Sequence, residues 1–539
     1  MIAGAQTHVL AAILHGGAAM DPQHLSALLR ERARLHPHST ALTHDRRTIT
    51  YAELLAGSLR AAGALREAGV GPGARVACLD KDSERVYELL FACAHLGAVW
   101  VGLNWRLTAR ELRFVIADSG ARCLFAGAEF WDKAREASHE LPGLDRLVVL
   151  RGAADGASYD EWCASSAPID AFVDSDREQP AVQLYTSGTT GNPKGVLLAH
   201  RSFFAVIDAL RGASDTWIGW NERDVVLQCI PSFHIGGLWW AMVALQHGAR
   251  LVVLPAFSGW QVLEAIERER VTKACLVPAM IQTCLEEPGC ARTDFSSLGH
   301  LVYGGSPIPE PLLRRAMATF GCAFAQIYGL TETGNTAVCL RPADHAGARA
   351  ELVKAAGRPY PLVRIEIVDR DGRALPARAI GEIRIHSPAN MLGYWNQPAA
   401  TAATLRDGWV HTGDAGYLDE EGYVYVCDRV KDMIISAGEN IYPAEIESVL
   451  AAHPALLEVA VIGVPHARWG EEVKAIAVLR EGAAASAREL LAFARGKLAD
   501  FKLPRSVEFV ERLPRTPSGK LKKAELRAPY WAGRERQVN

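Results

Sequence analysis

Short strand-like runs alternate with amphipathic helical stretches along most of this chain, and the alternation restricts the folds that it can form. Apolar residues three and four positions apart indicate helices at residues 23–34 and 51–68. β-branched runs between helical stretches indicate strands at residues 75–79, 147–150, 181–185 and 250–254. Strands that alternate with helices form mainly parallel sheets covered by helices. The sequence therefore predicts an α/β fold.

The pattern changes in the later part of the chain. Residues 365–368 and 381–385, with polar turns between them, are typical of antiparallel strands and indicate a small β-barrel-like part. Beyond residues 429–432 come the helical and strand-like stretches of a small α+β domain, at residues 444–452, 459–464, 473–479 and 487–498. A chain of 539 residues is too long for one ordinary core. We predict a large N-terminal domain over residues 1–430 and a small C-terminal domain over residues 431–539.

Composition and charge exclude several classes of function. The formal net charge is -3, and no basic stripe indicates a nucleic-acid partner. The eleven cysteines form no C-x-x-C pair and no zinc-binding spacing, which fits reduced thiols in the cytoplasm. The longest apolar stretch, residues 236–245, has about half of the ~20 residues that a membrane span needs. We therefore expect a cytoplasmic protein with at most peripheral membrane contact.

An apolar segment at residues 9–19 lies near the N-terminus. No Lys or Arg precedes it, so it makes a poor signal peptide. We expect residues 1–20 to form a mobile tail, and Met20 is an alternative start of translation.

The strongest local signal is the loop at residues 185–196, YTSGTTGNPKGV, which follows a β-rich run. Glycines allow the backbone to turn its N–H groups toward an anion, hydroxyl groups donate further hydrogen bonds, and Lys194 adds a positive charge. The usual P-loop pattern, G-x-x-x-x-G-K-[ST], does not fit this segment at any register. The loop is thus a candidate polyphosphate site, with a flexible surface loop as the alternative.

This loop resembles the signature loop of the adenylate-forming superfamily, which includes acyl-CoA synthetases, firefly luciferase and the adenylation domains of peptide synthetases. Other segments resemble further motifs of the family and follow in the family's order. They are PSFHIGGL (231–238), YGGSPIP (303–309), YGLTETG (328–334), GWVHTGDAGYLDEEGY (408–423), DRVKDMIISAGENIYPAEIE (428–447) and PRTPSGKL (514–521). The resemblance covers residues 40–527. It implies a ligase that adenylates a carboxylic acid with ATP and Mg²⁺, and then passes the acyl group to the thiol of coenzyme A.

The resemblance also implies an ATP site. Its residues are Thr186, Ser187, Gly188, Thr189, Thr190, Gly191, Lys194, Gly304, Gly305, Ser306, Gln326, Ile327, Tyr328, Gly329, Thr331, Asp414, Arg429 and Lys520. Within it, Thr331 contacts the α-phosphate and Tyr328 lies against adenine. Glu332, with Thr186, binds the metal, and a carboxylate between two threonines suits a Mg²⁺ ion carried on phosphates.

Asp414 resembles a family aspartate that accepts hydrogen bonds from both ribose hydroxyls, and Arg429 resembles an arginine that donates to the same sugar. A carboxylate is a natural acceptor for a vicinal diol. The alternatives are a turn aspartate and an arginine in a surface ion pair. Gly304 and Gly305 would let the backbone lie flat along adenine and the acyl chain, and otherwise they form a turn.

The acyl pocket implied by the resemblance is lined by His234, Trp239, Gly304, Gly305 and Gly329. A structural imidazole is the alternative for His234, and aromatic core packing is the alternative for Trp239 and for Trp240 beside it. The segments FHIGGLWW and LVPAMIQTCLEE (276–287) are largely apolar and offer no cation for a second carboxylate. We expect a hydrophobic monocarboxylic acid, either a medium or long fatty acid or a cyclic or aromatic acid.

Lys520 is the strongest single candidate for catalysis. Negative charge converges where the acid attacks the α-phosphorus, and a cation there stabilises the transition state. By resemblance, the small domain is a mobile lid that rotates at a hinge, Lys431. Rotation withdraws Lys520 and brings Ser436, Ala437 and Gly438 over the CoA channel. The implied catalytic residues are Lys520, Glu332, Thr331 and His234.

Two other functions stay open at this point. One is an adenylating enzyme that loads an acyl carrier protein, although SAGENIYPAEIE is more like the CoA-ligase version of its segment. The other is a catalytically silent homologue that binds nucleotide or acyl ligand, against which the intact Glu332, Asp414, Arg429 and Lys520 argue. The exact acid and the oligomeric state, including a homodimer, are not predicted.

Overall fold

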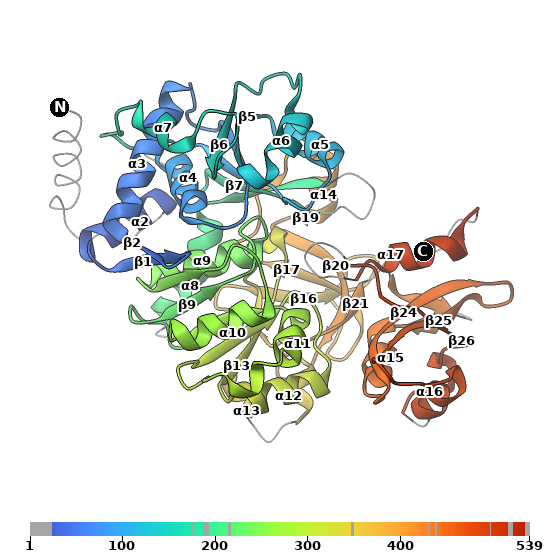
Figure 1. Cartoon of the computed structure of the whole chain (residues 1–539). Coiled ribbons are helices and arrows are strands. Elements are labelled where there is room, and N and C mark those ends of the chain that lie inside the picture. Colours follow the sequence, from blue (N-terminus) through green and yellow to red (C-terminus); the bar gives the residue numbers. More distant parts are fainter. Residues whose placement is uncertain are drawn as a thin grey trace.

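The computed structural model describes nine stretches of the chain. They are residues 24–173, 176–186, 193–213, 217–346, 350–429, 432–436, 439–495, 497–515 and 521–533. Three sheets form the large N-terminal part, and a fourth sheet forms the small C-terminal part, drawn in orange and red in Figure 1. The expected N-terminal tail, residues 1–20, lies outside the described residues.

A seven-stranded sheet occupies the first part of the chain, in the order β18-β8-β7-β4-β3-β5-β6. Its strands are β3 (Arg75–Leu79), β4 (Val99–Gly102), β5 (Ala121–Gly127), β6 (Arg146–Arg151), β7 (Pro180–Thr186), β8 (Lys194–Ala199) and β18 (Gly393–Tyr394). Strands β7, β4, β3, β5 and β6 run parallel, while β8 and β18 join antiparallel at one edge. This edge carries the hairpin of the predicted phosphate loop.

Helices cover both faces of the seven-stranded sheet. Alternate residues of a strand point to opposite faces, and those of β3 enter two different core clusters. Val76 and Cys78 pack with α3 (Tyr51–Glu67) and α4 (Glu84–His95). Ala77 and Leu79 pack on the other side, with α5 (Ala109–Ser119) and α6 (Trp131–Ser138).

A nine-stranded sheet follows, in the order β15-β14-β13-β12-β11-β9-β10-β1-β2, and its six central strands are parallel. Its strands are β1 (Thr40–His44), β2 (Arg47–Thr50), β9 (Val225–Gln228), β10 (Arg250–Val253), β11 (Lys273–Leu276), β12 (His300–Gly304), β13 (Ala323–Tyr328), β14 (Val338–Leu340) and β15 (Arg358–Pro359). The helices of this region are α2 (Leu25–Leu35), α8 (Arg201–Gly212), α9 (Ile235–Gln246), α10 (Gly259–Arg268), α11 (Pro278–Glu286), α12 (Glu310–Phe320) and α13 (Pro342–Ala346).

Helix α9 contains the longest apolar stretch of the chain, and eleven of its twelve residues are buried. It belongs to the same core cluster as α3 and α4, so the helix joins the packing of the two large sheets. A helix that is apolar all round is buried in a core or in a membrane. In the part of the chain that the structure describes, none of the helices has the length and apolar character of a membrane span.

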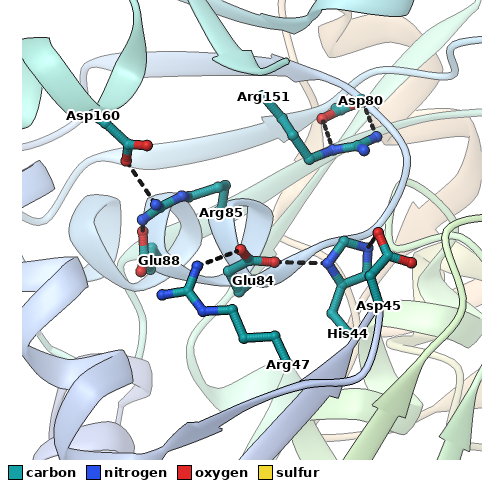
Figure 2. A network of polar contacts seen from close by, with 9 residues as sticks. All are labelled: His44, Asp45, Arg47, Asp80, Glu84, Arg85, Glu88, Arg151 and Asp160. Carbon is teal, nitrogen blue, oxygen red and sulfur yellow. Dashed lines mark hydrogen bonds and ion pairs between the residues drawn. The ribbon is translucent and has the colours of Figure 1, made fainter.

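A network of charged side chains ties the β1–β2 hairpin to the first turn of α4 (Figure 2). Nδ1 of His44 lies 2.8 Å from Oε2 of Glu84, and the guanidinium of Arg47 lies 3.5 Å from the other carboxylate oxygen. Burial alone would raise the pKa of Glu84, but hydrogen bonds from His44 and from the backbone, together with the nearby charges of His44 and Arg85, outweigh burial and lower the pKa to about 2. Arg85, the next residue of α4, pairs with both Glu88 and Asp160.

The predicted antiparallel strands lie in a five-stranded antiparallel sheet, and the barrel-like character expected for this part stays a prediction. The sheet consists of β16 (Arg364–Val368), β17 (Gly381–His386), β19 (Leu405–Arg406), β20 (Trp409–Leu418) and β21 (Val424–Arg429), with α14 (Pro398–Thr404) before β19. Strand β21 ends at Arg429, two residues before the predicted hinge Lys431.

The small C-terminal part has its own core clusters. Its sheet has the order β23-β22-β25-β24, with β26 beside β25. The elements are β22 (Ile434–Ser436), β23 (Glu439–Ile441), α15 (Pro443–Ala451), β24 (Leu456–His466), β25 (Gly470–Leu479), α16 (Ala487–Ala494), β26 (Ser506–Phe509) and α17 (Lys523–Trp531). The predicted fold class is confirmed: an α/β fold with a large N-terminal and a small α+β C-terminal part. The exact boundary stays a prediction, since residues 430 and 431 are not described.

One predicted helix ends earlier than its sequence pattern indicated. Residues 487–498 were expected to be helical, but α16 ends at Ala494. Arg495 has φ -60° and ψ 139°, an extended conformation that cannot continue a helix.

Candidate active site

The predicted phosphate loop connects β7 and β8 at the sheet edge. Thr186, the last residue of β7, pairs with Lys194, the first residue of β8, so both stand at the base of the loop. Nζ of Lys194 lies 4.9 Å from the centroid of the Tyr394 ring. The remaining predicted loop residues, Ser187, Gly188, Thr189, Thr190 and Gly191, lie outside the described residues.

Glu332 lies in a short 3-10 turn, Thr331–Thr333, that follows β13. The hydroxyl of Thr333 accepts a hydrogen bond from the backbone N–H of Leu330 at 2.9 Å and closes the turn. Oε1 of Glu332 accepts a hydrogen bond from the hydroxyl of Tyr394 at 2.8 Å. Tyr394 thus contacts both Glu332 and Lys194, two residues that the sequence assigned to one phosphate and metal site.

Strands β20 and β21 place Asp414 directly opposite Arg429. Nε of Arg429 lies 2.8 Å from Oδ1 of Asp414, and the hydroxyl of Tyr328 donates to Oδ2 at 2.7 Å. Asp414 is only 5% exposed. Burial and the neighbouring Asp414 carboxylate raise the pKa of the Tyr328 phenol, so the hydroxyl stays protonated and donates. The three residues predicted to hold the nucleoside are therefore joined by direct contacts.

Arg429 also connects this group to Glu332. Burial lowers the pKa of Arg429, but the negative charges of the neighbouring carboxylates, Asp414 first and then Glu332 and Asp432, raise it above its usual value. The guanidinium additionally donates to the backbone carbonyl of Thr412 at 3.1 Å. The candidate ribose site and the candidate metal site are thus electrostatic neighbours.

The carboxyl ends of the parallel strands β12 and β13 lie next to these groups, since Tyr328 is the last residue of β13. Gly304 pairs with Ile327, while Gln326 and Tyr328 flank Ile327 on β13. A Cβ atom at Gly304 would lie 2.4 Å from the carbonyl oxygen of Ile327, so the two strands approach too closely for a side chain. Ligand sites in open α/β sheets lie at these carboxyl ends.

The other residues predicted near these strand ends lie in the turns that follow β12 and β13. Gly305 has φ +79°, in the left-handed region that favours glycine, and the exposed Ser306 follows it. Gly329 comes after β13, where a Cβ atom would lie 2.7 Å from the backbone of Asn335.

His234 is the N-cap residue of α9, and its ring centroid lies 4.5 Å from that of Phe233. Trp239 is 1% exposed and packs against Trp217 and Trp240, with ring centroids 6.1 and 6.0 Å away. Trp239 therefore lies in the packed core, as the alternative interpretation expected. A role for Trp239 in an acyl pocket stays a prediction.

Ser436, the last residue of β22, borders a groove of about 220 Å³ on the small part of the protein. The groove is lined by Ser436, Glu439, Trp469, Val473, Phe501, Leu503 and Arg505. Phe501 is 44% exposed, and the Arg505 guanidinium lies 5.0 Å from the Trp469 ring. Ala437 and Gly438, also predicted to contact CoA, lie outside the described residues.

Lys520 and the predicted hinge Lys431 are likewise not described. The two sides of the segment that carries Lys520 are joined at its base. Arg515 and Leu521 form an antiparallel bridge, and the N–H of Lys522 donates to the carbonyl of Pro514 at 2.9 Å.

Mg²⁺ fits the donors that the described residues provide here. Within the described residues, no cluster of three or more His, Cys, Asp and Glu side chains forms a metal site made by the protein alone. Glu332 offers a single carboxylate beside the threonines of its turn, a hard oxygen donor that suits an ion bound mainly through phosphates.

Sequence reasoning missed two residues of this site, Tyr394 and Asp82. Tyr394 lies in a two-residue strand, too short for a periodicity signal. Asp82 is a buried carboxylate that accepts hydrogen bonds from the N–H and the hydroxyl of Ser232, two residues before His234. An acidic residue before a helix looks like an ordinary cap in sequence.

Comparisons with known proteins agree with this arrangement. The AMP-binding enzyme family model matches residues 29–395, and the model of the AMP-binding enzyme C-terminal domain matches residues 445–520. The fatty acid–acyl-carrier-protein ligase ScoC of Streptomyces coeruleorubidus is 49% identical over 508 residues, 94% of this chain and 96% of ScoC. A feruloyl-CoA synthase of an Amycolatopsis species is 41% identical over 512 residues, 95% of this chain and 100% of that enzyme. The crystal structure of ATP-bound MatB from Rhodopseudomonas palustris matches with a TM-score of 0.86 and 32% identity, covering 95% of this chain and 99% of MatB. The chain therefore belongs to the AMP-binding enzyme family.

Proposed function

We propose that this protein is an ATP-dependent carboxylic acid–CoA ligase. In the first half-reaction, a carboxylate oxygen of the acid attacks the α-phosphorus of ATP and pyrophosphate leaves. In the second, the thiol of CoA attacks the acyl carbonyl carbon, AMP leaves, and the thiol proton passes to solvent. The observation that carries the proposal is the position of Arg429. Its guanidinium pairs with Asp414, and the negative charges of Asp414 and Glu332 both raise its pKa.

Different residues of the site support binding of the ribose, of the phosphates and of the metal ion. Asp414, held by Arg429 and Tyr328, would accept the ribose hydroxyls. Lys194 at the base of the phosphate loop would face the phosphates. Glu332, with Thr186, would hold Mg²⁺, which neutralises phosphate charge when bound with ATP.

We assign the small part of the protein to a mobile lid that serves both half-reactions. Lys520 would neutralise charge during adenylation, and rotation at Lys431 would then bring the Ser436 segment over the site. The groove beside Ser436 supports this assignment, because an exposed aromatic ring and an arginine suit a nucleotide that carries phosphate groups.

The proposed substrate is a hydrophobic monocarboxylic acid. Helix α9 beside His234 is apolar except for Gln246 at its end, and α11 is mostly apolar. Three of the relatives support this class, since their names describe ligases for a fatty acid, feruloyl and indoleacetate groups. A cytoplasmic location is supported by the eleven cysteines, all of which are free thiols and nine of which are buried.

An acyl carrier protein is the second candidate acceptor. The observation that favours it is the relative ScoC, 49% identical across nearly the whole chain and named as a fatty acid–acyl-carrier-protein ligase. Both acceptors present a phosphopantetheine thiol, so the first half-reaction would be unchanged.

The test is a panel of fatty and aromatic acids assayed with ATP and Mg²⁺. We expect pyrophosphate release with a hydrophobic acid, and multiple turnovers of AMP release only when CoA is added. Lys520→Ala serves as the control, because loss of one transition-state donor should slow adenylation by about 10²–10³-fold. Turnover with a pantetheinylated carrier protein but not with CoA would favour the second candidate. Absence of pyrophosphate release with every acid would contradict both.

A further inference from the structure

We propose that Tyr394 is a positioning residue for adenylation: it fixes the orientation of the Glu332 carboxylate, the candidate ligand of the Mg²⁺ ion that ATP carries. The inference rests on the proposed function, because it concerns how Mg²⁺ and ATP are held. Tyr394 contacts two candidate phosphate-site residues from different segments of the chain. Its hydroxyl donates to Oε1 of Glu332 at 2.8 Å, and its ring centroid lies 4.9 Å from Nζ of Lys194.

The backbone of Tyr394 is fixed on both sides. Strand β18 adds to β8 in antiparallel register, with Gly393 opposite Leu197 and Tyr394 opposite Val196. The N–H groups of the flanking residues donate to the same strand, Leu392 to the carbonyl of Leu197 at 2.9 Å and Trp395 to the carbonyl of Gly195 at 2.8 Å. The ring of Tyr394 is therefore held against the strand that begins with Lys194.

The same segment is also tied to the Glu332 turn through its backbone. The N–H of Met391 donates to the backbone carbonyl of Glu332 at 2.8 Å. The hydroxyl of Thr401 accepts from the N–H of Tyr394 at 2.9 Å, which links β18 to α14. The turn is thus anchored by Met391, and its carboxylate is oriented separately by Tyr394.

A positioned carboxylate matters because a free glutamate side chain samples many rotamers, and fixing one has an entropic cost on binding. Tyr394 is 9% exposed, so its hydroxyl points at Glu332 from within the packed fold. In the absence of the hydroxyl, Glu332 would have to be ordered when Mg·ATP binds. The ring contact with Lys194 does not need the hydroxyl, so the two contacts of Tyr394 can be separated by experiment.

The test uses Tyr394→Phe in the full-length protein, with Mn²⁺ standing in for Mg²⁺. The dissociation constant of Mn·ATP is measured by equilibrium dialysis without the acid, so that no turnover occurs, and the KM for Mg·ATP is measured alongside. We expect both constants to rise about tenfold, the size of one hydrogen bond to a charged group. The KM for the acid should change less than twofold.

A matched control removes the same atom elsewhere in the large part. The hydroxyl of Tyr159, which is buried, donates to Oε2 of Glu88 at 3.2 Å. Tyr159→Phe should lower the melting temperature and leave Mn·ATP binding unchanged. If Tyr394→Phe behaves in the same way, Tyr394 is only a structural residue and the proposal is overturned.

A double variant tests whether Tyr394 acts through Glu332. Glu332→Gln should weaken Mn·ATP binding, and adding Tyr394→Phe to it should weaken binding less than twofold further, because the oriented carboxylate is already gone. Full additivity of the two effects would overturn the proposal. Wild-type protein that does not bind Mn·ATP would instead refute the proposed function, so the two failures are distinguishable.

Discussion

Asp82 is a carboxylate enclosed between the two large sheets. It follows β3 of the seven-stranded sheet and accepts hydrogen bonds from Ser232 and from Nε2 of Gln228, at the end of β9 in the nine-stranded sheet. Tyr87 contacts Ser232 from α4. Asp82 is 4% exposed, and burial raises its pKa to about 6, although the hydrogen bonds from Ser232 and Gln228 act in the opposite direction. Asp82 therefore fixes the position of the segment that precedes His234.

This raised pKa predicts a specific pH dependence of stability. An unfolded aspartate titrates near 3.8, so between about pH 4 and pH 6 the folded protein binds more protons at Asp82. Stability from this group is therefore present at low pH and falls as the pH rises through that window, by about 3 kcal/mol at most. Asp82→Asn removes this dependence, and its melting temperature relative to wild type should rise between pH 4 and pH 6 and then stay level.

Thermal unfolding of both proteins from pH 4 to pH 8 checks this prediction, because every other titrating group is common to both and cancels. The exposed Asp371, changed to Asn, is the control for the loss of a surface carboxylate. A constant difference for Asp82→Asn would show that its pKa is not raised in the folded protein.

At the scale of elements, the close pairing of β12 with β13 shapes the candidate nucleotide site. A methyl group at Gly304 would overlap the carbonyl of Ile327 and push the strand ends apart. Gly304→Ala should destabilise the protein by about 1–3 kcal/mol, as overpacking commonly does, and raise the KM for ATP. Thermal unfolding and initial-rate kinetics measure the two effects. Gly71→Ala is the control, since a Cβ atom there meets nothing within 4 Å; equal effects of both substitutions would refute the argument.

Local elements could be predicted from sequence, whereas long-range pairing could not. The predicted strand at residues 75–79 is β3 as observed, because its apolar run has clear ends. The pairing of β18 with β8 joins positions about two hundred residues apart, and no local pattern encodes it. Tyr394 became a candidate only through that pairing. The roles assigned to Asp414 and Arg429 stay predictions, but their registered contact across β20 and β21 supports them.

At the scale of the whole molecule, a set of charged contacts spans the predicted hinge. Asp428, at the end of the large part, accepts a hydrogen bond from the N–H of Ala444 at 3.0 Å and lies 3.5 Å from Nζ of Lys523. Lys523 also pairs with Glu447 at 2.9 Å. Burial lowers the pKa of Lys523, but the two carboxylates outweigh burial and raise it, so the side chain stays charged. Rotation at Lys431 would break the contacts of Asp428 and spare the pair within the small part.

Asp428→Asn should therefore change the balance between the two half-reactions. The amide keeps an acceptor for Ala444 and loses the charge that attracts Lys523, which weakens the described arrangement by about 1 kcal/mol, or roughly fivefold. The half-reaction that uses this arrangement should slow by about that factor, while the other should not. Single-turnover pyrophosphate release measures adenylation, and transfer from preformed acyl-adenylate to CoA measures the second step.

Arg527→Met is the matched control, because Arg527 and Asp432 form an equally buried ion pair in which both residues follow the hinge. It should lower the melting temperature and leave the ratio of the two rates within about twofold. Equal slowing of both steps by Asp428→Asn would show that these contacts stabilise the fold without favouring either arrangement.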